Sequence, residues 1–165
     1  MSPSNQVAIR VDHPGGRRFA PGLARFAERA LARLGLRRCQ LSICLATDEQ
    51  IQDLNRHWRA RNRPTDVLSF PSGETPVAQS ALRLLGDVVL SLDTATARAG
   101  KRGVRRELER YLAHGILHLL GYDHRRRQAA AIMAALEIKL VGGQGLIPAR
   151  RGAGGRKHAA KKNRC

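Results

Sequence analysis

Hydrophobic and polar residues alternate in two short segments near the N-terminus, and a period of two is typical of β-strands. These segments are residues 7–11 and 41–45. Between them, apolar residues recur at intervals of three and four over 21–34, which predicts an amphipathic helix that ends at a glycine. Thr47 followed by Gln50 has the spacing of a capping box and predicts a second, short helix.

The second half of the chain predicts more strands and helices. Residues 86–92 are apolar on both sides, as expected for a strand inside a sheet. The strongest helical pattern, 104–120, is followed by Gly121 at the position of a C-terminal glycine cap. The other predicted elements are a strand at 66–70, one or two helical turns at 94–99 and a helix at 129–141.

This order of elements predicts one α+β domain at residues 1–142, with a small mixed β-sheet packed with helices. The chain of 165 residues is long enough for one sizeable core but hardly for two. A loop rich in Pro, Ser and Gly is expected at 71–80. The tail, 143–165, is expected to be basic and disordered, because no hydrophobic period continues into it.

We expect a cytoplasmic protein without a membrane partner. No apolar run could cross a bilayer, and the first residues lack the basic-then-apolar order of a signal peptide. Cys39 and Cys44 lie five residues apart on a predicted strand, hence on opposite faces, and are expected to stay reduced. Cys165 is expected to be a free thiol in the tail.

The net charge points to a polyanionic partner. Thirty Lys and Arg against thirteen Asp and Glu give +17, and seven of the basic residues lie between 150 and 164. Each Lys or Arg placed on a phosphate releases condensed counterions, so nucleic acid is favoured, and the tail should add non-specific RNA affinity. Aromatic residues make up only 4% of the chain. We therefore expect little base stacking, and we expect Trp58 to lie in the core.

The strongest chemical signal is a group of three histidines. Residues 112–121, LAHGILHLLG, contain no charged side chain, so His114 and His118, one helical turn apart, are expected to be buried. A turn after Gly121 would let His124 face the same point. Three imidazoles with an open fourth corner are typical of a catalytic zinc site, although the spacing also suits nickel, copper or iron. The other histidines, namely His13, His57 and His158, are given no function.

The spacing of this pair is that of zinc metalloproteases, but one residue argues against proteolysis. Their general base is a glutamate directly after the first histidine, and this chain has Gly115 there. Either a metal-activated water reacts without that base, or another group assists.

The segment from His114 to His124, HGILHLLGYDH, resembles the signature of the bacterial YbeY family of endoribonucleases and rRNA maturation factors. Three further segments are similar to the family pattern: Leu54-Asn55 with Trp58-Arg59, PTDVLSFP at 64–71, and LGDVVLS at 85–91. The resemblance runs from about Val7 to Leu140 and does not cover the tail.

The resemblance implies a cytoplasmic endoribonuclease that binds one zinc ion per chain through the three histidines and cleaves single-stranded RNA. It implies a part in maturing the 3′ end of the 16S rRNA precursor and in quality control of late-stage ribosomes or small subunits. It also implies a catalytic role for Arg59, whose guanidinium could hold the scissile phosphate bidentately. Arg61 and Arg63 are expected only to attract the phosphate backbone of the RNA.

Some alternatives stay open. Asp123 either accepts a hydrogen bond from a ligand histidine or caps the next helix. Thr65, Asp66 and Ser69 are expected to shape the loop and sheet beside the site. A non-catalytic, zinc-containing ribosome assembly factor that docks on rRNA is the main alternative function. A metal-dependent protease is disfavoured by Gly115 and by the charge.

Overall fold

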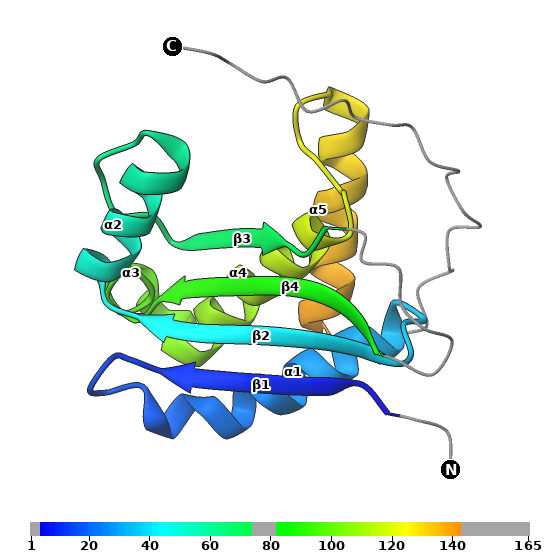
Figure 1. The fold of residues 1–165 in the computed structure, drawn as a ribbon, viewed down its shortest axis with the longest axis horizontal. Helices are drawn as coiled ribbons and strands as arrows, with labels where there is room; N and C mark the ends of the chain where they lie inside the picture. The colour runs from blue at the N-terminus through cyan, green and yellow to red at the C-terminus, as the bar shows by residue number, and fades with distance from the viewer. Residues whose placement is uncertain (1–3, 74–81, 143–165) are drawn as a thin grey trace.

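A computed structural model describes residues 4–73 and 82–142, and within them the chain forms a four-stranded sheet in the order β1-β2-β4-β3 (Figure 1). Strands β1 (Gln6–Val11), β2 (Cys39–Ala46) and β4 (Arg83–Ser91) are parallel. Strand β3 (Val67–Pro71) runs antiparallel to β4 at one edge of the sheet. The tail predicted at 143–165 and most of the loop predicted at 71–80 lie outside the described residues.

The helices lie close to the predicted positions. The long helices are α1 (Ala20–Arg33), α2 (Asp48–Arg59), α4 (Val104–Leu119) and α5 (Arg127–Gly142). The shorter elements are α3 (Leu92–Arg98) and the single 3₁₀ turns Arg17–Phe19 and Gly100–Arg102. The prediction of a single α+β domain with a mixed sheet is confirmed. No helix of the described chain is long and apolar enough to cross a membrane.

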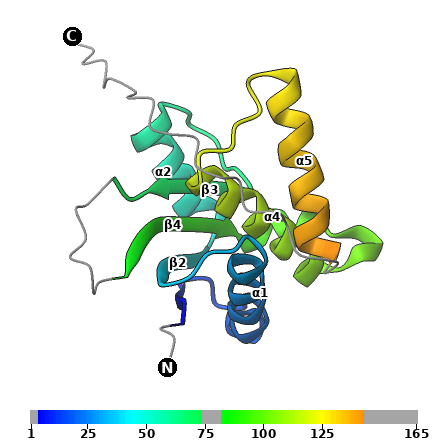
Figure 2. The ribbon, with the colours of Figure 1, turned by 90° about the vertical axis from the view of Figure 1, so that its right-hand side faces the viewer.

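The main core lies between one face of the sheet and the helices α1 and α4. Leu41, Ile43 and Leu45 are every second residue of β2, so all three point into this core, where they are almost completely buried. Helix α5 packs against α4 on the side away from the sheet, as Figure 2 shows. Helix α4 is therefore enclosed between the sheet and α5, and its residues face both.

Among the described residues, α2 covers one end of the opposite face of the sheet. The capping box predicted at its start is present, because the Gln50 amide donates to Thr47 Oγ1 at 3.2 Å and the Thr47 amide to Gln50 Oε1 at 3.0 Å. Ile51 of α2 is fully buried in a small cluster with Leu68 and Val89. This cluster anchors the first turns of the helix and leaves the last turn uncovered.

The expectation that Trp58 belongs to the core is wrong. The residue is 64% exposed, although its position continues the helical spacing of the apolar residues of α2. The cause is the position of the helix. The cluster around Ile51 ends before the last turn of α2, so Trp58 lies outside it, with ring contacts to Phe70 and to its neighbour His57.

The two cysteines of the described chain are unpaired. Cys39 is buried and Cys44 is partly exposed, as expected for opposite faces of one strand. Burial is the largest cause that raises the pKa of both thiols. Both are therefore protonated, unreactive thiols at neutral pH. Cys165 lies outside the described residues.

Gly115 marks the closest approach of α4 to the sheet. A Cβ atom at this position would lie 2.6 Å from Cγ1 of Val88 and 3.1 Å from Oγ of Ser69. The Ser69 hydroxyl donates to the Gly115 carbonyl at 3.1 Å, which ties β3 to the helix. The residue after the first histidine therefore faces packed strands, and a glutamate of the metalloprotease type has no room there.

We predict that Gly115→Ala destabilises the protein, although alanine is the better helix former. The new methyl group would have to displace Val88, and overpacking of this kind costs about 1–3 kcal/mol, more than the propensity gain of about 1 kcal/mol. Thermal unfolding of both proteins measures the change. Gly22→Ala in α1 is the matched control, because its Cβ would meet only Arg105 at 3.7 Å. A Gly115→Ala protein as stable as the control would contradict the packing argument.

Candidate metal centre

The end of helix α4 reverses the chain within two residues. Gly121 has a positive φ of 86°, and its amide donates to the His118 carbonyl at 3.0 Å. The Tyr122 amide donates to the Leu117 carbonyl at 3.1 Å, which completes a Schellman motif. The predicted glycine cap is confirmed, and it directs the chain back so that His124 faces the end of the helix it has just left.

The structure brings His114, His118 and His124 together. Their potential ligand atoms all lie within 4.8 Å of one another, and no other group of three such side chains occurs among the described residues. The ring centroids are 4.5 Å apart for His114 and His118, 5.2 Å for His118 and His124, and 5.9 Å for His114 and His124. His114 and His118 are partly buried, less than was expected for the pair, and His124 is exposed.

This donor set fits a metal ion. The Nε2 atoms of His114 and His118 face each other at 2.9 Å. Ligand nitrogens of a tetrahedral zinc ion, at about 2.0–2.1 Å from the metal, are separated by roughly 3.3 Å. The pair needs to open only slightly to accept an ion, and His124 supplies a third nitrogen. The partial exposure leaves the site accessible to a substrate.

The environment of His118 favours the neutral imidazole, which is the form that ligates metals. Burial is the largest cause that lowers the pKa of His118, followed by the charges of His114 and His124. A hydrogen bond with the Tyr122 backbone acts in the opposite direction. The charge of Arg59, 59 residues away in sequence, is the last of the causes that lower the pKa of His118.

The sequence analysis missed one side chain of this site, Glu137. Its carboxylate contacts Nδ1 of His114, from helix α5. If Nδ1–H donates to Glu137, the lone pair of His114 is on Nε2, which is the atom that faces His118. A signal was present in the sequence. Glu137 is the only acidic residue of α5 and lies at helical spacing between the buried Met133 and Leu140.

Asp123 shows neither of its two alternatives in the described contacts, because its hydrogen bond lies in the turn before α5, which begins only at Arg127. Its carboxylate accepts a hydrogen bond from the Arg125 amide and lies 3.7 Å from the Arg125 guanidinium, which stabilises the turn before α5. Asp66 likewise shapes the loop at β3, because it accepts hydrogen bonds from the Val67 amide at 2.9 Å and from Thr65 at 3.2 Å.

The arginine-rich loop after α2 is held by one buried amide. Asn55 is only 3% exposed, and its Nδ2 donates to the Arg63 carbonyl at 2.8 Å. The Arg61 amide donates to the Asn55 carbonyl at 3.2 Å. Arg59, Arg61 and Arg63 are exposed, and none forms an ion pair with another described residue. A fixed backbone therefore presents three uncompensated positive charges.

Comparison with known proteins gives consistent matches. The family model described as Endoribonuclease YbeY matches residues 17–143. The chain is 52% identical over 145 residues to the endoribonuclease YbeY of Anaeromyxobacter dehalogenans, covering 87% of this chain and 74% of that protein. It is 48% identical over 145 residues to that of Myxococcus xanthus, covering 87% of this chain but only 49% of the relative.

A solution structure of a protein from Thermotoga maritima has a similar fold, with a TM-score of 0.55 at 23% identity. The match covers 84% of this chain and 91% of the Thermotoga chain. At this identity the likeness concerns the fold, and it supports the arrangement of sheet and helices described above.

We predict that Glu137→Ala weakens zinc binding by about 10- to 100-fold, because an unsupported His114 ring is free to rotate and to change tautomer. Competition with a chromophoric chelator measures the dissociation constant. Glu137→Gln keeps an acceptor oxygen and should bind zinc with intermediate affinity. The exposed Glu28→Ala on α1 is the control. Unchanged zinc affinity in Glu137→Ala, with the metal-free protein still folded by circular dichroism, would show that Glu137 does not orient the ligand.

Proposed function

Because this chain belongs to the endoribonuclease YbeY family, we propose that it is a metal-dependent endoribonuclease that cleaves single-stranded RNA. The observation that carries the proposal is the convergence of three histidine nitrogens within 4.8 Å, and the contribution of Arg59 to the lowered pKa of His118 supports it. A metal site and a phosphate-binding cation side by side are what phosphodiester cleavage requires.

His114, His118 and His124 would hold one metal ion per chain, and we propose zinc. Three neutral imidazoles that leave one position open are typical of catalytic zinc sites. When bound, zinc supplies a Lewis acid beside the scissile phosphate and lowers the pKa of water. Glu137 fixes the orientation of His114, and the Schellman turn at Gly121 keeps His124 in place.

Arg59 would bind the scissile phosphate and stabilise the negative charge that grows on it during cleavage. It is the last residue of α2, and the loop that follows is held by Asn55. A guanidinium can donate two parallel hydrogen bonds to phosphate oxygens. Arg61 and Arg63 add attraction for the neighbouring phosphates, which is electrostatic and independent of base sequence.

We propose that the physiological substrate is ribosomal RNA in the cytoplasm, specifically the 3′ end of the 16S rRNA precursor, and that the enzyme also acts on defective small subunits or ribosomes. The resemblance of the histidine and arginine segments to the family supports this substrate. The net charge of +17 is consistent with a large polyanionic target.

A non-catalytic assembly factor that docks on rRNA is the second candidate. One observation favours it: Gly115 lies against the sheet where metalloproteases carry their catalytic base, so the centre lacks that carboxylate. In that case the metal would serve only to hold the α4–α5 turn. Cleavage by the purified protein separates the two functions.

We predict that the purified protein contains one zinc ion per chain and cleaves single-stranded RNA, and that His118→Ala loses both properties. Elemental analysis and gel electrophoresis of a labelled oligoribonucleotide measure them. His57→Ala, which changes an exposed histidine of α2, should keep its zinc. Equal zinc in the native and His118→Ala proteins would exclude the site, and a zinc-loaded protein without cleavage would favour the assembly factor.

Arg59→Ala is expected to keep its zinc and to lose about 100-fold or more in turnover, because a preorganised charge at the phosphate is removed. Single-turnover cleavage together with zinc analysis tests this expectation. Arg25→Ala on α1 removes the same charge elsewhere and should cleave RNA at nearly the native rate. Loss of zinc from Arg59→Ala would instead mean that the arginine maintains the centre.

A further inference from the structure

Trp58 is the single tryptophan of the chain and the most unusual exposed side chain near the site. Its ring is 64% exposed at the last turn of α2. Its contacts with His57 and Phe70 have ring centroids 5.0 Å and 6.0 Å apart and interplanar angles of 79° and 66°. Both are edge-to-face contacts, so neither neighbour lies flat on the indole. Since neither neighbouring ring is stacked on the indole and the residue is mostly exposed, the indole can receive another flat ring.

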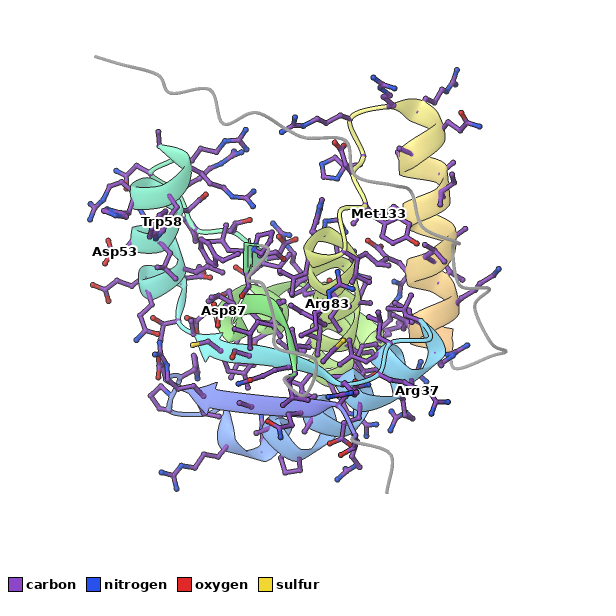
Figure 3. All side chains as sticks on the ribbon, turned by 45° about the vertical axis from the view of Figure 1, so that its right-hand side comes forward. Arg37, Asp53, Trp58, Arg83, Asp87 and Met133 are labelled. Carbon is purple, nitrogen blue, oxygen red and sulfur yellow. The ribbon has the colours of Figure 1, made fainter. Side chains whose placement is uncertain are left out.

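Trp58 borders a groove on the face of the sheet opposite α4. The groove has a volume of about 840 Å³, and Leu54, Phe70 and Val89 supply apolar walls. Figure 3 shows Trp58 on α2 and Asp87 on β4, and both residues line the groove. The open part of this face is therefore apolar at the end next to α2.

Strand β3 separates this groove from the histidines. Ser69 turns its hydroxyl to α4 and the Gly115 carbonyl, whereas Phe70, the next residue, turns to the groove and to Trp58. β3 is an edge strand of the described sheet, and its side chains alternate between the two sides. Arg59 and Trp58 are adjacent residues of α2, with Arg59 near His118 and Trp58 at the groove.

The charged residues around the groove indicate where the phosphates and where the bases of an RNA strand would bind. Arg59, Arg61 and Arg63 are exposed and follow Trp58 within five residues of the chain, where they can neutralise a phosphate backbone. Arg10, inside the groove, is paired with Asp12 at 2.8 Å. Asp87 on the lining would repel a phosphate, but its carboxylate can accept hydrogen bonds from the amino groups of bases. The groove therefore suits bases, and the three arginines suit the backbone.

We propose that Trp58 forms a base-stacking subsite for single-stranded RNA, placed across strand β3 from the metal centre. The inference rests on the proposed ribonuclease function. A nucleotide flanking the scissile phosphate stacks its base on the indole, while Arg59, Arg61 and Arg63 hold the backbone. Stacking on an aromatic ring accepts any base, so the subsite selects unpaired RNA without selecting a sequence. A base inside a duplex is already stacked on both sides and cannot enter.

The single tryptophan allows a direct test with the full chain stripped of metal, so that RNA binds without being cleaved. Titration with a twelve-nucleotide oligouridylate or oligoadenylate should quench the tryptophan fluorescence. Inorganic polyphosphate, a polyanion without bases, should bind the arginines without this quenching. Trp58→Ala should weaken oligonucleotide binding by roughly tenfold, within the range that base stacking supplies, and Trp58→Phe should keep most of the affinity.

The salt dependence of RNA affinity distinguishes base stacking from electrostatic attraction. Trp58→Ala should keep the native slope of affinity against salt, whereas Arg63→Ala should flatten it, because one fewer counterion is displaced. Ile138→Ala, at an exposed residue of α5, is the control for removing apolar surface and should bind like the native protein. Since Trp58 is mostly exposed, circular dichroism of Trp58→Ala should show the native fold.

The outcomes distinguish this subsite from the nuclease function. Quenching in the native protein and a tenfold loss of affinity in Trp58→Ala, without any cleavage of RNA by the native metal-loaded protein, would support the subsite and overturn only the catalytic proposal. Affinity within twofold of native in Trp58→Ala would overturn the subsite, even in an active nuclease, and would leave the groove to a protein partner. Equal quenching by polyphosphate and oligonucleotide would also overturn it.

Discussion

The close packing of α4 between the sheet and α5 is the constraint on which the rest of the structure depends. Gly115 lets the helix approach β3 and β4 so closely that no other side chain fits between them. This contact places His114 and His118 beside the edge strand, with α5 on the other side to supply Glu137. A helix held on two sides can present two imidazoles in a fixed relation, which is what metal coordination requires.

The same packing explains why the protein has the ligand spacing of a metalloprotease without its catalytic base. In such an enzyme, the residue after the first histidine must point to the substrate. Here it points to Val88 and Ser69, because the helix packs on the sheet through that position. Groups that assist the histidines have to come from other elements: Glu137 of α5 contacts His114, and Arg59 of α2 contributes to the lowered pKa of His118.

The edge strand β3 organises the surfaces around the site. Its residues alternate between α4 on one face and the groove beneath α2 on the other, and Ser69 and Phe70 are the clearest example. At the end of helix α2, Trp58 lines the groove, and the adjacent Arg59 contributes to the lowered pKa of His118. A flexible, single-stranded polyanion is a ligand that can contact both sides of β3, whereas a rigid duplex cannot.

Local patterns in the sequence were sufficient for the elements and the histidines. Strand alternation, helical periodicity and the capping box depend on neighbouring residues, and His114, His118 and His124 converge through one helical turn and one glycine turn. Glu137 and Trp58 could not be placed in this way. Whether Glu137 meets His114 depends on how α5 packs against α4, and the exposure of Trp58 depends on where the buried cluster beneath α2 ends. The approach of Arg59 to the histidines joins segments 59 residues apart, and only the packing of α2 at the end of the sheet decides it.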